Sequence, residues 1–141
     1  MAQDRPDLVA DLDAVRSLLR RALELAPDFG EGAIHATFIS IESLPKMMGG
    51  SPERAREHFE AAVRLSGGKN ATAFVTLAAS VAVAEQDLDE FRALLDQALA
   101  VDPDGVSELR LANRIAQRRA RVLRDRAEEL FLDYVPEAAS P

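Results

Sequence analysis

Cysteine is absent from the 141 residues of this chain. Disulfides, thiolate metal sites and a cysteine nucleophile are therefore excluded. Long apolar runs are missing too, because the longest, at positions 71–84, is interrupted by Thr72, Thr76 and Ser80. It falls short of the roughly 20 apolar residues that a membrane-spanning helix needs. The residues Met1–Asp13 are acidic and mostly polar, unlike a signal peptide. We expect no segment that spans the membrane directly. The chain is expected to be either a cytosolic protein or the mature or trimmed form of a longer one.

An excess of basic charge is also lacking, since the formal net charge is −7 and only 5% of the residues are aromatic. This balance argues against general affinity for nucleic acids or anionic membranes, so we expect no nucleic-acid partner. The charge is nevertheless uneven. Between Arg110 and Arg126 lie seven arginines, opposed within that stretch only by Asp125.

Catalytic groupings are not recognisable in the sequence. No nucleophile has a credible neighbouring base, and no pair of histidines has the one-turn spacing of a metal site. The glycines at Gly49–Gly50 are not followed by the Lys-Ser/Thr of a phosphate-binding loop. We predict that the chain is not an enzyme and needs no cofactor or metal.

Helical periodicity dominates what is present. Apolar residues recur at helical spacing, as in Val15, Leu18, Leu19, Ala22 and Leu25, and no segment offers a partner for a strand. The sequence predicts an all-α chain forming a single helical-repeat domain over positions 1–141. The predicted helices cover residues 8–26, 28–44, 51–66, 70–86, 87–101, 107–126 and 127–135.

Capping signals set several of these boundaries. Asp28 with Glu31, and Asp87 with Glu90, have the spacing of capping boxes. Ser51 is expected to cap the third helix, with Pro52 at its first position, and Gly67 to end it.

A repeat links three of these helices. The segments VRSLLRRALELAP, AREHFEAAVRLSG and FRALLDQALAVDP each place a large apolar residue three before an alanine and a breaker five after it. The alanines are Ala22, Ala62 and Ala98, spaced by 40 and then 36 residues. Self-similarity at this period is typical of a helical solenoid and is close to the tetratricopeptide pattern. We predict stacked antiparallel hairpins with all three alanines buried where helices cross.

A family resemblance extends over most of the chain, from about Leu8 to Phe131. It is carried by LLRRALELAPDFGEGAIHATFISIE, by MGGSPERAREHFEAAVRLSGGKNATAFVTLAASVAVAEQD and by LRLANRIAQRRARVL. The runs Gly30–His35 and Met48–Glu53 are its most specific parts. These segments resemble the T component of tripartite ATP-independent periplasmic (TRAP) transporters, and this chain resembles the C-terminal portion of such proteins.

That resemblance implies a periplasmic, often lipid-anchored helical-repeat protein. It further implies association with the substrate-binding component of the transporter, assembly into trimers, and a cleft or pore that passes a small organic ligand. From its sequence we expect the chain to depart from the family pattern, because no signal peptide, lipidated cysteine or N-terminal half is recognised in these residues.

The arginines of the last long helix are the first candidate site. Arg110, Arg114, Arg118 and Arg121 are spaced by 4, 4 and 3 residues, which places them on one helical face. Guanidinium groups pair bidentately with carboxylates, so the face suits an organic carboxylate or an acidic partner. The alternative is a solvated face whose arginines pair with carboxylates of neighbouring helices.

If helices 28–44, 70–86 and 107–126 line one concave groove, that arginine face would lie near His35, Glu42 and Phe74. The phase of the last helix is open by one residue, which would rotate its side chains by about 100°. His35 has the alternative of a structural hydrogen bond between helices, and His58 is expected to be exposed.

Two functions are therefore open from the sequence. The first is a non-catalytic accessory binding subunit of a TRAP-type solute transporter, as the resemblance implies. The second is a cytosolic tetratricopeptide adaptor that binds a partner peptide in its concave groove.

Overall fold

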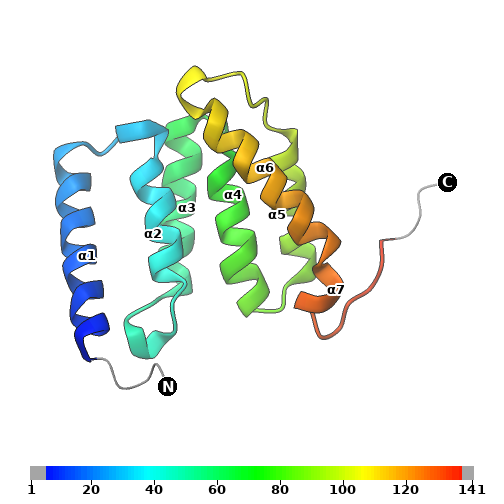
Figure 1. Cartoon of the computed structure of the whole chain (residues 1–141), viewed down its shortest axis with the longest axis horizontal. Helices are drawn as coiled ribbons and strands as arrows, with labels where there is room; N and C mark the ends of the chain where they lie inside the picture. The colour runs from blue at the N-terminus through cyan, green and yellow to red at the C-terminus, as the bar shows by residue number, and fades with distance from the viewer. Residues whose placement is uncertain (1–5, 138–141) are drawn as a thin grey trace. The chain divides into compact units, whose positions relative to one another are not determined.

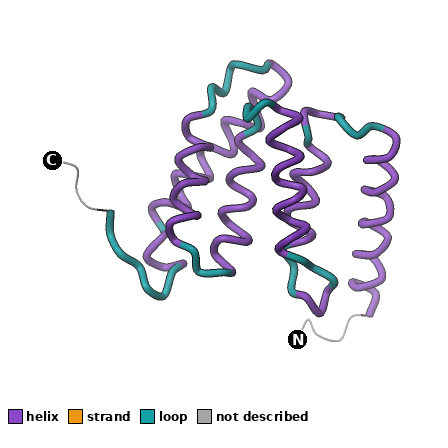
Figure 2. The backbone as a smooth tube through the Cα atoms, turned by 180° about the vertical axis from the view of Figure 1, so that it is seen from behind, coloured by secondary structure: helices purple, strands orange, loops and turns teal. Residues whose placement is uncertain are grey.

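The computed structural model describes residues 6–137, with side chains from Asp11 onward, and within that range helices are joined by loops and no strand is present (Figures 1 and 2). This confirms the predicted all-α class, whereas the stacking into a solenoid stays a prediction. The α-helices are α1 (Pro6–Leu25), α2 (Ala33–Glu42), α3 (Pro52–Ser66), α4 (Ala71–Leu77), α5 (Leu88–Ala100), α6 (Arg110–Asp125) and α7 (Ala127–Leu130).

The chain divides into two compact units, the first ending at Gly68 and the second beginning at Lys69. Their membership in one continuous repeat domain stays a prediction, so each unit is described by itself. None of the helices in the described part of the chain is long and apolar enough to cross a membrane.

Two of the predicted caps are confirmed. The side chain of Ser51 accepts a hydrogen bond from the backbone N–H of Arg54, with Pro52 in the first turn of α3. The carboxylate of Asp87 accepts one from the backbone N–H of Glu90 at 2.8 Å. These contacts supply acceptors to N–H groups that a helix leaves unpaired at its start, which fixes where α3 and α5 begin.

The predicted capping box of α2 is wrong. Asp28 makes no side-chain capping bond, because a 3₁₀ turn at Phe29–Glu31 separates it from the helix. Glu31 and Gly32 take positive φ angles of 53° and 84°, so the chain turns again before α2 starts at Ala33. Backbone geometry that favours glycine therefore wins over the local capping signal.

The first unit is built around the packing of α2 on α3 (Figure 1). Phe38 and Ile39 of α2 are buried, and Ala62 of α3 is completely so. A Cβ placed on Gly32 would lie 2.9 Å from the Cα of Ala62 and 3.4 Å from its Cβ, so Gly32 has no room for a side chain where it approaches Ala62. The burial predicted for Ala62 is confirmed, but that predicted for Ala22 is wrong, since Ala22 of α1 is only half-buried.

Helix α1 is attached to the first unit mainly through charge. Arg16 is its one buried side chain among residues 11–25. Its guanidinium lies 3.6 Å from the carboxylate of Glu42 and donates hydrogen bonds to the carbonyls of Met48 and Gly49. Arg54 of α3 donates to the same carboxylate at 2.9 Å. A buried carboxylate between two guanidiniums therefore joins α1, α2, α3 and the loop before α3.

In the second unit, α4, α5 and α6 contact one another. Their shared core includes Phe74 and Leu77 of α4, together with Phe91 and Leu95 of α5. Helix α4 continues into a π-helical turn at Ala78–Ala82. The third repeat alanine, Ala98, is fully buried, as predicted.

The contrast between Ala62 and Ala22 gives a matched pair of variants. We expect Ala62→Leu to lower the free energy of unfolding by about 1–3 kcal/mol, because the larger side chain collides with the backbone at Gly32. Ala22→Leu should stay within about 0.5 kcal/mol, since Ala22 is half-buried and leucine forms helices well. Urea denaturation followed by circular dichroism measures both, and equal stabilities would contradict the assigned packing.

Candidate functional site

Helix α6 is held by its inner side through two buried amides. The Oδ1 of Asn113 accepts the backbone N–H of Ala71 at 2.8 Å, and its Nδ2 donates to the carbonyl of Lys69 at 2.9 Å. One turn further on, the Nε2 of Gln117 donates to the carbonyls of Ala98 at 3.1 Å and Val101 at 2.7 Å. Asn113 thus joins α6 to the start of α4, and Gln117 joins it to the end of α5.

These contacts fix the rotation of α6 and therefore which residues face outward. Leu111, Ile115 and Val122 lie opposite the two amides and are 71%, 60% and 50% exposed. At about 100° per residue, the three fall within about 40° of one another around the helix. Helix α6 therefore carries a narrow apolar stripe on its solvent side, which the sequence pattern alone had not singled out.

Four of the seven arginines in this segment are paired with the chain's own carboxylates. Asp104, in the loop before α6, receives two of them, with atoms 2.9 Å and 3.1 Å apart. The pairs are Arg110–Asp104, Arg114–Asp104, Arg124–Asp96 and Arg126–Glu129. The alternative of a charge-paired face thus applies to Arg110 and Arg114 of the predicted site.

The middle of the helix differs. Arg118, Arg119 and Arg121 are exposed, and no carboxylate of the described residues lies within 4.0 Å of them. From their helical positions, Arg118 lies at the edge of the apolar stripe, about 20° from Leu111, with Arg119 on one flank and Arg121 on the other. Three guanidiniums available for an external partner are therefore interleaved with apolar side chains. We call these six residues the α6 face: Leu111, Ile115, Arg118, Arg119, Arg121 and Val122.

A shallow groove adjoins the α6 face on the side of Arg119. It has a volume of about 280 Å³ and lies between α4 and α6. Its walls are mainly apolar, formed by Val75, Ala112, Ile115 and Ala116, with Thr72, Thr76 and Arg119 also lining it. Arg119 and Ile115 belong to both features, so groove and stripe form one continuous surface within the second unit.

The other predicted site residues are placed differently. Phe74 is buried in the core of the second unit, whereas His35 and Glu42 belong to the first unit. Glu42 is 2% exposed and is engaged by Arg16 and Arg54. A groove that joins these residues to the arginines of α6 stays a prediction.

His35 of α2 meets His58 of α3. Their Nδ1 atoms are 2.9 Å apart, and the ring of Phe38 stacks on His58 with centroids 4.5 Å apart. His58 is half-buried rather than exposed, which corrects the expectation from its charged sequence neighbours. The pair lies 23 positions apart in sequence, so helical spacing could not reveal it. The structural hydrogen bond considered for His35 is confirmed.

Burial lowers the pKa of both histidines. For His35, the neighbouring His58 and Arg64 lower the pKa further. For His58, Glu42 and Glu57 oppose the effect of burial and Arg54 adds to it. Lowering the pKa of both rings favours their neutral forms, and between two neutral rings one Nδ1–H can donate to the other Nδ1.

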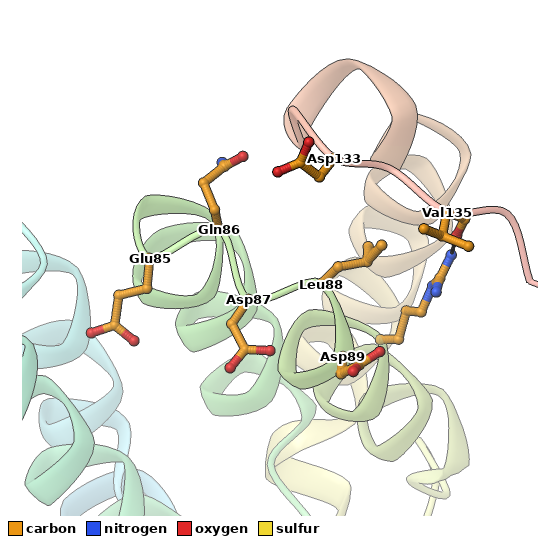
Figure 3. A pocket seen from close by; sticks show the side chains of 8 residues that line it. Glu85, Gln86, Asp87, Leu88, Asp89, Asp133 and Val135 are labelled. Carbon is orange, nitrogen blue, oxygen red and sulfur yellow. Dashed lines mark hydrogen bonds between the residues drawn. The ribbon is translucent and has the colours of Figure 1, made fainter.

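A larger hollow, about 600 Å³, lies where the segment before α5 and the start of α5 meet the C-terminal segment (Figure 3). Gln86 and Arg92 hold that segment, since Gln86 Oε1 accepts the backbone N–H of Leu132 and Arg92 donates to the carbonyl of Val135. Carboxylates dominate its lining, namely Glu85, Asp87, Asp89 and Asp133. In the described part of the chain, however, no three His, Cys, Asp or Glu side chains are arranged to hold a metal.

The α6 face thus combines three arginines unpaired within the described chain with three exposed apolar side chains. The family model of the TRAP transporter T-component matches residues 1–131. The chain belongs to this family of transporter accessory components.

A relative from Treponema pallidum (strain Nichols), an uncharacterized protein, is 31% identical over 129 residues. The aligned region covers 91% of this chain but 39% of the relative. The chain thus spans well under half the length of that protein.

The attachment of α6 can be tested at Asn113. We expect Asn113→Ala to lower the free energy of unfolding by about 1–3 kcal/mol, because it leaves the buried N–H of Ala71 without its partner and removes the hydrogen bond to the carbonyl of Lys69. Gln97→Ala, an exposed amide of α5, serves as the control and should change stability by less than about 0.5 kcal/mol. Indistinguishable urea midpoints for the two variants would show that the amide does not anchor the helix.

The histidine pair predicts how stability depends on pH. Since both pKa values are lowered by folding, the unfolded chain binds more protons as the pH falls below about 6.5. The free energy of unfolding should therefore be at its full value above that pH and decrease below it. Denaturation at about pH 7.5 and about pH 5.5 measures the decrease, which His35→Gln/His58→Gln should reduce. A decrease of unchanged size in that double variant would assign it to other groups.

Proposed function

We propose that this chain is a non-catalytic accessory binding component of a TRAP-type solute transporter. In this proposal it acts in the periplasm, where it associates with the substrate-binding component of the same transporter. Family membership supports the transporter setting. The observation that carries the binding role is the set of exposed arginines Arg118, Arg119 and Arg121, which lack carboxylates from the described chain.

The chemistry of these arginines favours an acidic partner. Each guanidinium presents several N–H donors in a plane and can bind a carboxylate through two hydrogen bonds. The chain as a whole carries a net charge of −7, so an acidic partner would be attracted only by this basic surface. That attraction would orient the partner as it approaches. An organic carboxylate is a second candidate for the same arginines, with Arg110 and Arg114 released from Asp104 when it binds.

The remaining predicted residues take supporting roles in this proposal. Glu42 and Phe74 are buried, so they would stabilise the two units rather than touch a partner. His35 would act through its bond to His58. Assembly into a trimer and stacking of the hairpins into a solenoid remain part of the proposal, with support from the family alone.

A binding experiment with the substrate-binding protein of the same transporter tests this function. We expect the purified wild-type chain to bind that protein, and Arg118→Glu/Arg121→Glu to weaken binding at least about tenfold, since charge reversal replaces attraction by repulsion. Arg20→Glu/Arg21→Glu, at two exposed positions of α1, is the charge-matched control and should bind like wild type. Biolayer interferometry at low and high salt gives the affinities. Failure of the wild-type chain to bind would refute the proposed association.

A further inference from the structure

We infer that the α6 face and the adjoining groove dock an amphipathic helix of a partner protein, with an apolar stripe bordered by acidic side chains. This inference rests on the proposed binding function and specifies the chemistry of the segment that is bound. It is carried by three properties of the surface: its length, its shape and the distribution of its charges.

The length of the stripe favours a helix over a small ligand. Leu111 and Val122 are eleven positions apart, which is about 16 Å along a helix at 1.5 Å per residue. A compact organic acid could contact one turn of this stripe, whereas three turns of a partner helix match it from end to end. Helices that bind in this way place apolar anchors three, four and seven residues apart, and the α6 stripe shows the spacings of four (Leu111 to Ile115) and seven (Ile115 to Val122).

The groove supplies the shape that such a helix needs. Next to the stripe, the small residues Ala112 and Ala116 let the surface sink between α4 and α6. The volume of about 280 Å³ accommodates apolar side chains of a partner helix laid along α6. Packing of side chains into grooves between neighbouring helices is how helices generally associate.

The charges define the borders of the partner's stripe. Arg119 lies on the groove side of the α6 face and Arg121 on the opposite side, with Arg118 between them. A partner helix with Glu or Asp on both borders of its apolar stripe would meet these guanidiniums while its apolar residues cover Leu111, Ile115 and Val122. A partner with lysines at those borders would be repelled, so the surface selects by charge as well as by shape.

Two other occupants fit the surface less well. An anionic bilayer is flat and would leave the α4–α6 groove unfilled, and the chain's net charge of −7 opposes its approach. A second copy could offer the exposed Leu18 and Leu25 of α1, but Arg21 and Glu24 beside them pair with each other at 2.9 Å, so neither is free to complement the arginines of α6.

The test uses three synthetic peptides of about sixteen residues, the length of α6. The first has leucines at the stripe spacing with glutamates at both borders, the second is a scrambled version of the same composition, and the third has lysines in place of the glutamates. We expect saturable binding of the first peptide to the wild-type chain by fluorescence anisotropy, weakening as salt is added, and no saturable binding of the other two.

Variants of the protein assign the binding to the α6 face. Leu111→Asp and Arg119→Glu should each weaken the affinity of the protein for the first peptide at least about tenfold. Their controls are Leu18→Asp, where the leucine is 71% exposed just as Leu111 is, and Arg20→Glu, both of which should bind like wild type. Circular dichroism spectra and melting curves check that every variant is folded. If Leu111→Asp and Arg119→Glu are both folded and both bind the first peptide like wild type, the inference is overturned.

The remaining outcomes are also decisive. Equal binding of scrambled and stripe peptides overturns the inference, as does no saturable binding of the stripe peptide. The inference is also overturned if the wild-type chain binds phosphatidylglycerol vesicles and Leu111→Asp abolishes that binding. The same holds if the wild-type chain self-associates in sedimentation and Leu111→Asp abolishes the self-association. If the substrate-binding protein binds the wild-type chain and both α6 variants equally, the inference fails while the proposed function stands. If the stripe peptide binds as expected but the substrate-binding protein does not, the proposed function fails and the docking surface stands.

Discussion

The amides of Asn113 and Gln117 hold α6 to the ends of the two helices beside it, and the candidate surface depends on these contacts. Both side chains bind backbone groups, which do not change with the surrounding sequence, and both are buried. Buried amides are unfavourable unless they are satisfied, so a rotation of α6 would leave several polar groups without partners. The attachment therefore sets the rotation of the helix. Its outer side is then free to carry residues that packing does not constrain.

The first unit uses buried charge for a comparable purpose. Arg16 is the buried side chain through which α1 reaches Glu42 and the loop before α3. Such a cluster contributes less net stability than apolar packing of the same volume, but it tolerates few alternative arrangements. In both units, polar contacts to backbone carbonyls thus fix where a helix lies, while small residues such as Ala62 and Ala98 let the neighbouring helices approach.

The sequence predicts what is local and misses what joins distant segments. Caps at Ser51 and Asp87 follow from residues within one turn, and the all-helical class follows from periodicity. The 3₁₀ turn after Asp28 could not be foreseen from the capping pattern, because the glycines allow backbone angles that compete with it. The His35–His58 bond was hidden for a different reason, since its partners come from two helices. The regular spacing of Arg110, Arg114, Arg118 and Arg121 indicated one face, but spacing does not tell which arginines find carboxylates within the chain.

That difference between paired and unpaired arginines explains how an acidic protein can offer a basic surface. The carboxylates that neutralise α6 lie near its ends, at Asp104 before it and Glu129 after it, or reach it from α5 at Asp96. Between Arg118 and Arg121 the described residues supply no paired carboxylate. The exposed apolar side chains on the same face are poorly hydrated, so the face is not simply a solvated row of charges. Covering the apolar stripe would remove water from around the guanidiniums and strengthen their attraction for carboxylates. A partner that supplies only the apolar part would leave the charges desolvated and unpaired, so the surface requires both features in the same segment.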